Sequence, residues 1–124
     1  MPDPVDSLSA VTLATSDMAA SVAFYDVVGL ALAHGGPEAA FSSYRVGPTS
    51  FLNLQLDAEW RPPERVWGRV VVWVPDVDAV HRRLLEAGVV PEFEPRDAPW
   101  GERYFHVLDP AGHEVSVARP LTGP

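Results

Sequence analysis

Residues 101–118 read Gly-Glu-Arg-Tyr-Phe-His-Val-Leu-Asp-Pro-Ala-Gly-His-Glu-Val-Ser-Val-Ala. Two alternating runs flank residues 109–112, where proline fixes φ and glycine permits a positive φ, so a tight hairpin turn is predicted. The alternation gives each strand an apolar face, with Phe105, Val107, Val115 and Val117, and a mixed face, with Tyr104, His106, Glu114, Ser116 and Ala118. A mixed face of this kind is compatible with a cavity wall and equally with a solvated surface.

Length and composition narrow the classes of protein. A chain of 124 residues with 47% apolar residues suits one globular domain with its own core. It contains no apolar run of membrane-spanning length and does not begin with a signal-peptide pattern, so we expect a cytoplasmic location and no membrane partner. The net charge of −8 disfavours nucleic acid as a partner and is compatible with a cationic ligand.

Two residue types are missing, and each excludes a kind of chemistry. The chain has no cysteine, which excludes disulfides, thiolate metal ligands and a cysteine nucleophile. It has no lysine, which excludes Schiff-base chemistry on a lysine side chain.

The rest of the chain predicts an α+β fold built from a repeated unit. Helices are predicted at about 17–28 and 76–87, each opened by an aspartate N-cap and closed by a glycine. The same offset of 59 residues separates Asp17 from Asp76 and Gly29 from Gly88. Besides the two strands of the opening stretch, strands are predicted at 8–14, 30–33, 39–46, 51–56, 67–74 and 89–93, with a linker at 61–64 and a proline-rich loop at 95–101.

This order is β-α-β-β-β, linker, β-α-β-β-β. We therefore predict one domain over residues 1–124, with internal modules at about 8–58 and 66–119. The second helix is predicted to bury Val77, Val80, Leu84 and Leu85.

Two motifs connect this pattern to a known family. Residues 24–30, Phe-Tyr-Asp-Val-Val-Gly-Leu, and residues 109–114, Asp-Pro-Ala-Gly-His-Glu, resemble the vicinal oxygen chelate superfamily. That superfamily includes glyoxalase I, extradiol dioxygenases, fosfomycin-resistance enzymes and bleomycin-resistance proteins. The resemblance extends over roughly residues 8 to 119 and implies a half-barrel cleft between the two modules. It indicates the fold and says little about the function.

The metal site of the superfamily is replaced in this sequence. By resemblance, His, Glu or Gln ligands come from the first and fourth strands of each module, and those positions carry Ala10, Asn53, Arg69 and Ser116. A permanently charged guanidinium at position 69 would repel a cation. We therefore expect no tightly bound metal and no cofactor. Three of the four histidines, at positions 34, 81 and 113, are expected on the surface.

The predicted cleft face is rich in aromatic residues. The expected ligand-binding set is Phe51, Asn53, Gln55, Trp67, Arg69, Trp73, Trp100, Tyr104, His106 and Ser116. Apolar walls with a few placed polar groups are typical of a small-molecule pocket. The same aromatic residues also suit a dimer interface or a closed barrel. Arg69 near Glu114 or Ser116 fits a structural ion pair as well as an anchor for a ligand acid group.

Three classes of function remain. The first is a metal-free protein that binds or sequesters an aromatic or cationic compound such as an antibiotic, as in the bleomycin-resistance branch. The second is a lyase, isomerase or dioxygenase-like enzyme that uses His106, Tyr104 or Glu114, or a metal at other positions. The third is a structural or regulatory partner domain. A homodimer is expected, because exposed strand edges are normally covered or paired.

Overall fold

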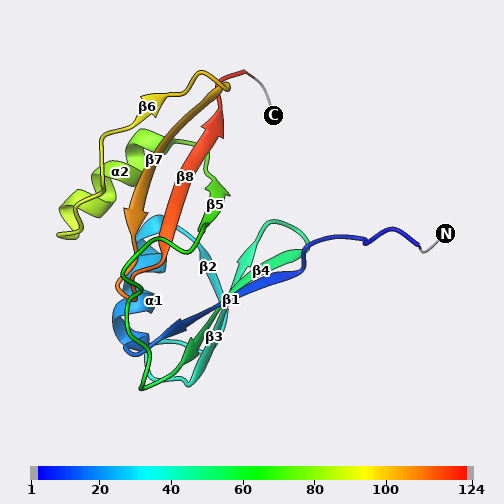
Figure 1. Ribbon diagram of the computed structural model, residues 1–124, viewed down its shortest axis with the longest axis vertical. Helices are drawn as coiled ribbons and strands as arrows, with labels where there is room; N and C mark the ends of the chain where they lie inside the picture. Colours follow the sequence, from blue (N-terminus) through cyan, green and yellow to red (C-terminus); the bar gives the residue numbers. More distant parts are fainter. Residues whose placement is uncertain (1–2, 123–124) are drawn as a thin grey trace.

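A computed structural model describes residues 3–122, and its strands form two separate four-stranded sheets of the same order. The first sheet contains β1 (Ala10–Thr15), β4 (Ser50–Leu56), β3 (Phe41–Val46) and β2 (Ala31–His34), and its helix is α1 (Met18–Val28). The second contains β5 (Arg69–Trp73), β8 (Glu114–Pro120), β7 (Glu102–Leu108) and β6 (Arg96–Asp97), with helix α2 (Val77–Glu86). In the first sheet β1 runs parallel to β4, and in the second sheet β5 runs parallel to β8 (Figure 1). The predicted α+β fold of two repeated modules is confirmed, and the sheets do not close into a barrel.

The helix boundaries follow the predicted caps. Asp17 accepts a hydrogen bond from the backbone N–H of Ala20 at 3.0 Å, and Asp76 accepts the equivalent bond from Ala79 at 3.0 Å. Gly29 ends α1 at a φ of 109°, a left-handed conformation that side chains other than glycine rarely adopt. These local signals depend only on neighbouring residues, which is why the sequence located both helices to within a residue.

One predicted strand is wrong. Residues 89–93 are not a strand, and β6 lies instead within the predicted proline-rich loop, where Arg96 pairs with Tyr104 of β7. Pro91 and Pro95 have no backbone N–H, so this segment cannot continue a hydrogen-bonded ladder. A single bond from the Glu92 N–H to the His106 carbonyl, at 2.8 Å, still ties it to β7.

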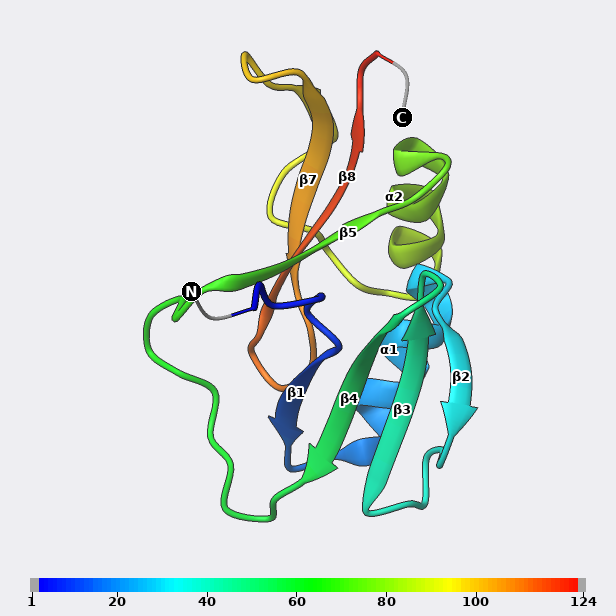
Figure 2. The ribbon, with the colours of Figure 1, turned by 90° about the vertical axis from the view of Figure 1, so that its right-hand side faces the viewer.

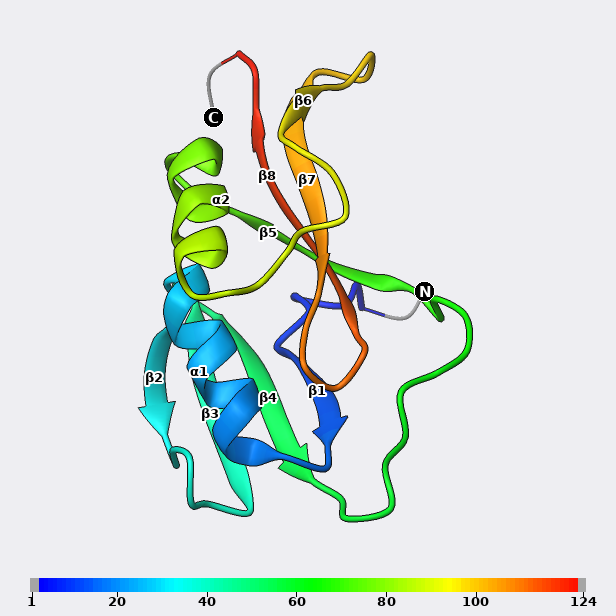
Figure 3. The same ribbon diagram turned by 90° about the vertical axis from the view of Figure 1, so that its left-hand side faces the viewer.

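The two modules share one core. Tyr25, Tyr44 and Phe105 are fully buried in a cluster that includes residues of both sheets and both helices. The helices lie against each other, and they cover one side of the molecule while the strands face the other side (Figures 2 and 3). The Tyr25 hydroxyl donates to the Asp109 carboxylate at 2.6 Å and joins α1 to the β7–β8 turn. No helix within residues 3–122 is long and apolar enough to cross a membrane.

Three predictions about individual side chains are wrong. Leu85 is 48% exposed instead of buried on the apolar side of α2. His81 is buried and packs edge-on against Phe105, with ring centroids 5.0 Å apart. His113 is also buried, because its Nε2 meets the Ala14 carbonyl at 2.8 Å in the other module. The burial or exposure of these three side chains depends on contacts with residues far away in the sequence, which a local sequence pattern does not indicate.

Candidate functional site

The face of the second sheet that points away from the helices gathers most of the predicted ligand-binding residues. Strand alternation sends Val72, Phe105 and Val117 into the core and leaves their neighbours on the opposite face. The strand register then places Arg69 beside Glu114, His106 beside Ser116 and Tyr104 beside Ala118. We call this surface the open face of the second sheet.

A charged cluster lies on this open face at the end where β5 and β8 begin. Arg69 Nε lies 2.6 Å from Glu114 Oε1, and the same oxygen lies 3.7 Å from His106 Nδ1. Arg69 is 45% exposed, whereas Glu114 is only 4% exposed. The loop that precedes β6 adds Glu92, which has a carboxylate oxygen within 4.8 Å of a ligand atom of His106 and of one of Glu114. Arg69 therefore forms an ion pair with Glu114, and the remaining side of Arg69 stays open to solvent.

The cluster separates the pKa values of its members. Burial, a hydrogen bond with Glu114 and the charge of Glu114 raise the pKa of Glu92 to about 7. Burial acts to raise the pKa of Glu114 too, but hydrogen bonds from Glu92 and Arg69 outweigh it and lower that pKa. Burial lowers the pKa of His106, and Glu114 only partly opposes this effect. Near neutral pH the cluster therefore contains an ionised Glu114, a neutral imidazole and a half-protonated Glu92.

An aromatic rim surrounds the cluster. Trp73 and Trp100 both donate their indole N–H to Glu102, at 3.2 and 2.9 Å, so one carboxylate holds both rings. Trp100 lies 5.3 Å from the ring of Tyr104, which lies 5.3 Å from that of His106. Phe93 contacts His106 with ring centroids 5.2 Å apart. Trp100, Tyr104, Phe93 and the His106 ring are therefore linked by ring contacts, and Trp73 joins them through Glu102.

Sequence reasoning missed three residues of this site. The predicted ligand-binding set does not include Glu92, Phe93 or Glu102, because the first two lie in a loop with no regular period, where a strand was predicted, and Glu102 follows the proline-rich loop. Glu102 begins β7 on the same face as Tyr104, so strand alternation could have predicted that it belongs to the site. Glu92 lies in an irregular loop, where no periodic pattern could have predicted its position.

Trp67 has a different environment from the other predicted aromatic residues. Its indole N–H donates to His113 Nδ1 at 3.0 Å, and its ring meets His113 edge-on. Trp60 stacks on the same imidazole, with centroids 5.0 Å apart. The linker is thus held against the β7–β8 turn by two tryptophans, and Trp67 is anchored at the margin of the open face although it is 55% exposed.

The remaining predicted residues lie on the first sheet. Phe51 and Asn53 line a shallow hollow with residues of β1 and β3, and none of the second-sheet residues lines it. Asn53 receives a hydrogen bond from Ser43 at 2.5 Å and donates to Thr12 at 3.2 Å. Gln55 is exposed at the end of the same strand. The ten predicted residues therefore divide into two groups on two sheets.

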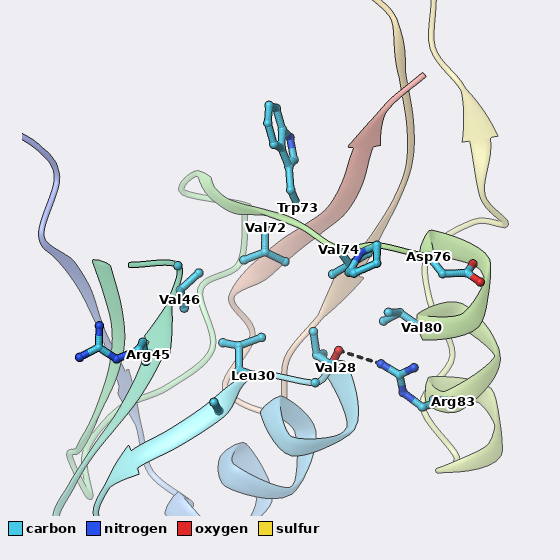
Figure 4. A pocket seen from close by; sticks show the side chains of 14 residues that line it. Val28, Leu30, Arg45, Val46, Val72, Trp73, Val74, Asp76, Val80 and Arg83 are labelled. Atoms are coloured by element: carbon cyan, nitrogen blue, oxygen red, sulfur yellow. Dashed lines mark hydrogen bonds between the residues drawn. The ribbon is translucent and has the colours of Figure 1, made fainter. Parts of the chain in front are cut away.

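A separate pocket of about 380 Å³ lies where α1 ends near β5 and α2 (Figure 4). Its wall is mostly aliphatic, and Trp73 is the predicted residue that reaches it. Arg83 crosses from α2 and donates to the carbonyls of Val27 and Val28, each at 3.0 Å. The guanidinium thus satisfies the exposed carbonyl end of α1, which is a structural role.

The residues at the family's metal positions do not fit a divalent cation. Ala10 has no ligand atom, the Asn53 amide is held by two neighbours, and Arg69 brings a positive charge. Ser116, on β8 of the second sheet, is buried and offers only a hydroxyl. The chemistry of a metal at those four positions is therefore not available to this chain.

Comparison with known proteins places the chain in a family. The model of the Glyoxalase/Bleomycin resistance protein/Dioxygenase superfamily matches residues 7–117. The chain belongs to this superfamily, which confirms the resemblance seen in its motifs. It is similar to the structures of a glyoxalase/dioxygenase from Nostoc punctiforme (TM-score 0.77, 17% identity, 93% of this chain and 91% of that one) and of TioX from Micromonospora sp. ML1 (TM-score 0.72, 28% identity, 93% and 99%).

Curated relatives match over a shorter segment. Uncharacterized proteins of Mycobacterium bovis and Mycobacterium tuberculosis are 44% identical to the chain over 48 residues. That segment is 39% of this chain and 32% or 28% of those proteins, so the match spans about a third of their length.

Proposed function

We propose that this chain binds, and thereby sequesters, a planar aromatic small molecule on the open face of the second sheet. The observation that carries the proposal is the exposure of Trp73 and Trp100, at 60% and 66%, on one face beside a buried charge. Soluble proteins rarely leave large aromatic rings together in water unless a ligand or partner covers them. Glu102 holds both rings in place, so little conformational entropy is lost when a flat molecule stacks there.

The charged cluster supplies the polar contacts for such a molecule. Arg69 uses Nε for Glu114, which leaves its two terminal nitrogens available to a ligand acid or phenolate group. Glu92 is the exposed carboxyl of the cluster and suits a ligand amine. The replaced metal positions favour sequestration over the metal-dependent reactions of the superfamily.

Tryptophan fluorescence tests this function. A panel of planar aromatic compounds with acid, phenol or amine groups is titrated into the protein, and at least one is expected to quench saturably. Trp73→Leu should weaken that binding about tenfold, since a stacked aromatic contact contributes about 0.5–1.5 kcal/mol beyond its buried area. Arg69→Ala should weaken the binding of acids selectively. Trp60→Leu, which removes a ring outside the open face, is the matched control.

Two outcomes would contradict the proposal. One is a complete lack of saturable quenching across the panel. The other is equal loss of binding in Trp73→Leu and Trp60→Leu, which would point to a general loss of structure. Mass spectrometry of the recovered compound separates sequestration from an enzyme, because a lyase or isomerase that uses His106, Tyr104 or Glu114 would return it altered.

We also propose that the chain forms a homodimer in which a second copy covers part of the open faces. Exposed apolar side chains occur on both sheets, with Phe41 at 39% and Leu56 at 43% on the first and Val71 at 53% on the second. A symmetric pair would bring Phe51, Asn53 and Gln55 of one copy near the charged cluster of the other, which would unite the divided ligand-binding set. Light scattering at micromolar concentration should report twice the chain mass, and a monomer would contradict this arrangement.

A further inference from the structure

Three metal-ligating side chains meet on the open face of the second sheet at positions other than those of the superfamily. One ligand atom from each of Glu92, His106 and Glu114 lies within 4.8 Å of the other two. Two carboxylate oxygens and one imidazole nitrogen suit first-row divalent cations such as Zn²⁺ and Mn²⁺. We propose that these three side chains form an exchangeable binding site for one divalent transition-metal cation per chain.

The backbone brings the three side chains together before any cation binds. His106 and Glu114 belong to adjacent antiparallel strands, where His106 pairs with Ser116 and Leu108 pairs with Glu114. The Glu92 N–H donates to the His106 carbonyl at 2.8 Å, so the loop that carries the third ligand is fastened to the second. The site therefore draws on two strands and one loop of a single module, and it needs no partner subunit.

The separations leave room for an ion between the ligand atoms. Ligand atoms bound to one cation at about 2.1 Å lie no more than about 4.2 Å from each other. The 3.7 Å between His106 Nδ1 and Glu114 Oε1 meets this limit and is too long for a hydrogen bond. The Glu92 ligand atom lies within 4.8 Å of the other two, so a rotation of this exposed side chain that breaks its hydrogen bond to Glu114 completes the site.

The His106 ring is already oriented for this role. It packs against both Phe93 and Tyr104, with ring centroids 5.2 and 5.3 Å away. Only 18% of the His106 side chain is exposed, so neighbouring rings restrict its rotation. A ligand whose rotation is restricted loses little entropy when a metal binds.

Arg69 sets the strength of the site. Arg69 Nε lies 2.6 Å from Glu114 Oε1. The guanidinium therefore competes with a cation for the carboxylate, and its positive charge repels the cation. A cation that binds Glu114 Oε1 therefore competes directly with Arg69 for that oxygen. The ion is therefore expected to exchange readily and to be lost on dialysis, which agrees with the expectation of no tightly bound metal.

Calorimetric titration of the untagged 124-residue chain with zinc chloride and manganese chloride tests the site. We expect one ion per chain, with Zn²⁺ bound more tightly than Mn²⁺. Glu92→Gln and His106→Gln should each weaken binding by about tenfold or more. Arg69→Gln should strengthen it, because the competing positive charge is gone. Glu94→Gln and His34→Gln make the same chemical changes at exposed positions and should leave the affinity unchanged.

Three results would overturn the proposal. They are no saturable binding of either metal at millimolar concentration, an equal affinity for Glu92→Gln and Glu94→Gln, and a weaker affinity for Arg69→Gln. A second measurement covers the case in which His106→Gln fails to fold. Mn²⁺ is paramagnetic, so in wild-type protein it should broaden the His106 imidazole resonances before those of His34, and the reverse order would place the ion elsewhere.

Discussion

Asp109→Ala is expected to lower the free energy of unfolding by about 4 kcal/mol, because three buried donors lose their acceptor together. Asp109 Oδ1 accepts the backbone N–H groups of Ala111 and His113, each at 2.9 Å. Its Oδ2 accepts the Tyr25 hydroxyl at 2.6 Å. The carboxylate is 4% exposed, so water cannot replace it. The substitution opens the hairpin turn and detaches α1 from it at the same time.

Urea unfolding measures this effect, and two variants give it a scale. Asp57→Ala removes a matched carboxylate that accepts the Glu59 N–H at 2.9 Å on the surface, where water takes over the bond. It should cost less than about 1 kcal/mol. Tyr25→Phe removes one of the three bonds and should cost an intermediate amount. Equal losses for Asp109→Ala and Asp57→Ala would show that Asp109 does not support the turn in the way described.

Glu114→Gln is expected to bring the pKa of Glu92 down from about 7 toward its ordinary value. The substitution removes the charge of Glu114 and its proton-sharing hydrogen bond, which are the second and third causes of the shift. The partial desolvation of the Glu92 carboxyl by its neighbours, the largest cause, remains, so the pKa should not return fully. Carboxyl carbon NMR across the neutral range measures this change. An unchanged Glu92 titration in Glu114→Gln would disprove the coupling between the two carboxyls.

The same pair gives the stability of the fold a defined pH dependence. Glu92 has a raised pKa in the folded state, so its contribution is present below the ordinary value of 4.5 and is lost as the pH rises toward about 7. Glu114 has a lowered pKa, so its contribution is present above 4.5 and is lost as the pH falls further. Urea unfolding should therefore show a decline between weakly acidic and neutral pH in the wild type, and Glu114→Gln should reduce that decline without abolishing it.

The sequence by itself determined the parts of this protein that depend on neighbouring residues. Alternation assigned Phe105 and Val117 to the core and Tyr104 and His106 to the opposite face, because successive side chains of a strand must point to opposite sides. Asp17 and Asp76 located both helices, because an N-cap bonds within its own first turn. The motifs around Tyr25 and Asp109 indicated the family because each is a run of consecutive residues that can be recognised in the sequence alone.

Only the tertiary structure decided which distant residues meet. His113 is buried because its Nε2–H donates to the Ala14 carbonyl across the module boundary, and His81 is buried because its ring packs edge-on against Phe105. Glu92 reaches Glu114 through an irregular loop held to β7 by one backbone bond. Such contacts depend on how strands register and how modules pack, and a local pattern contains neither. The charged cluster, and with it the proposed cation site, is a product of that packing.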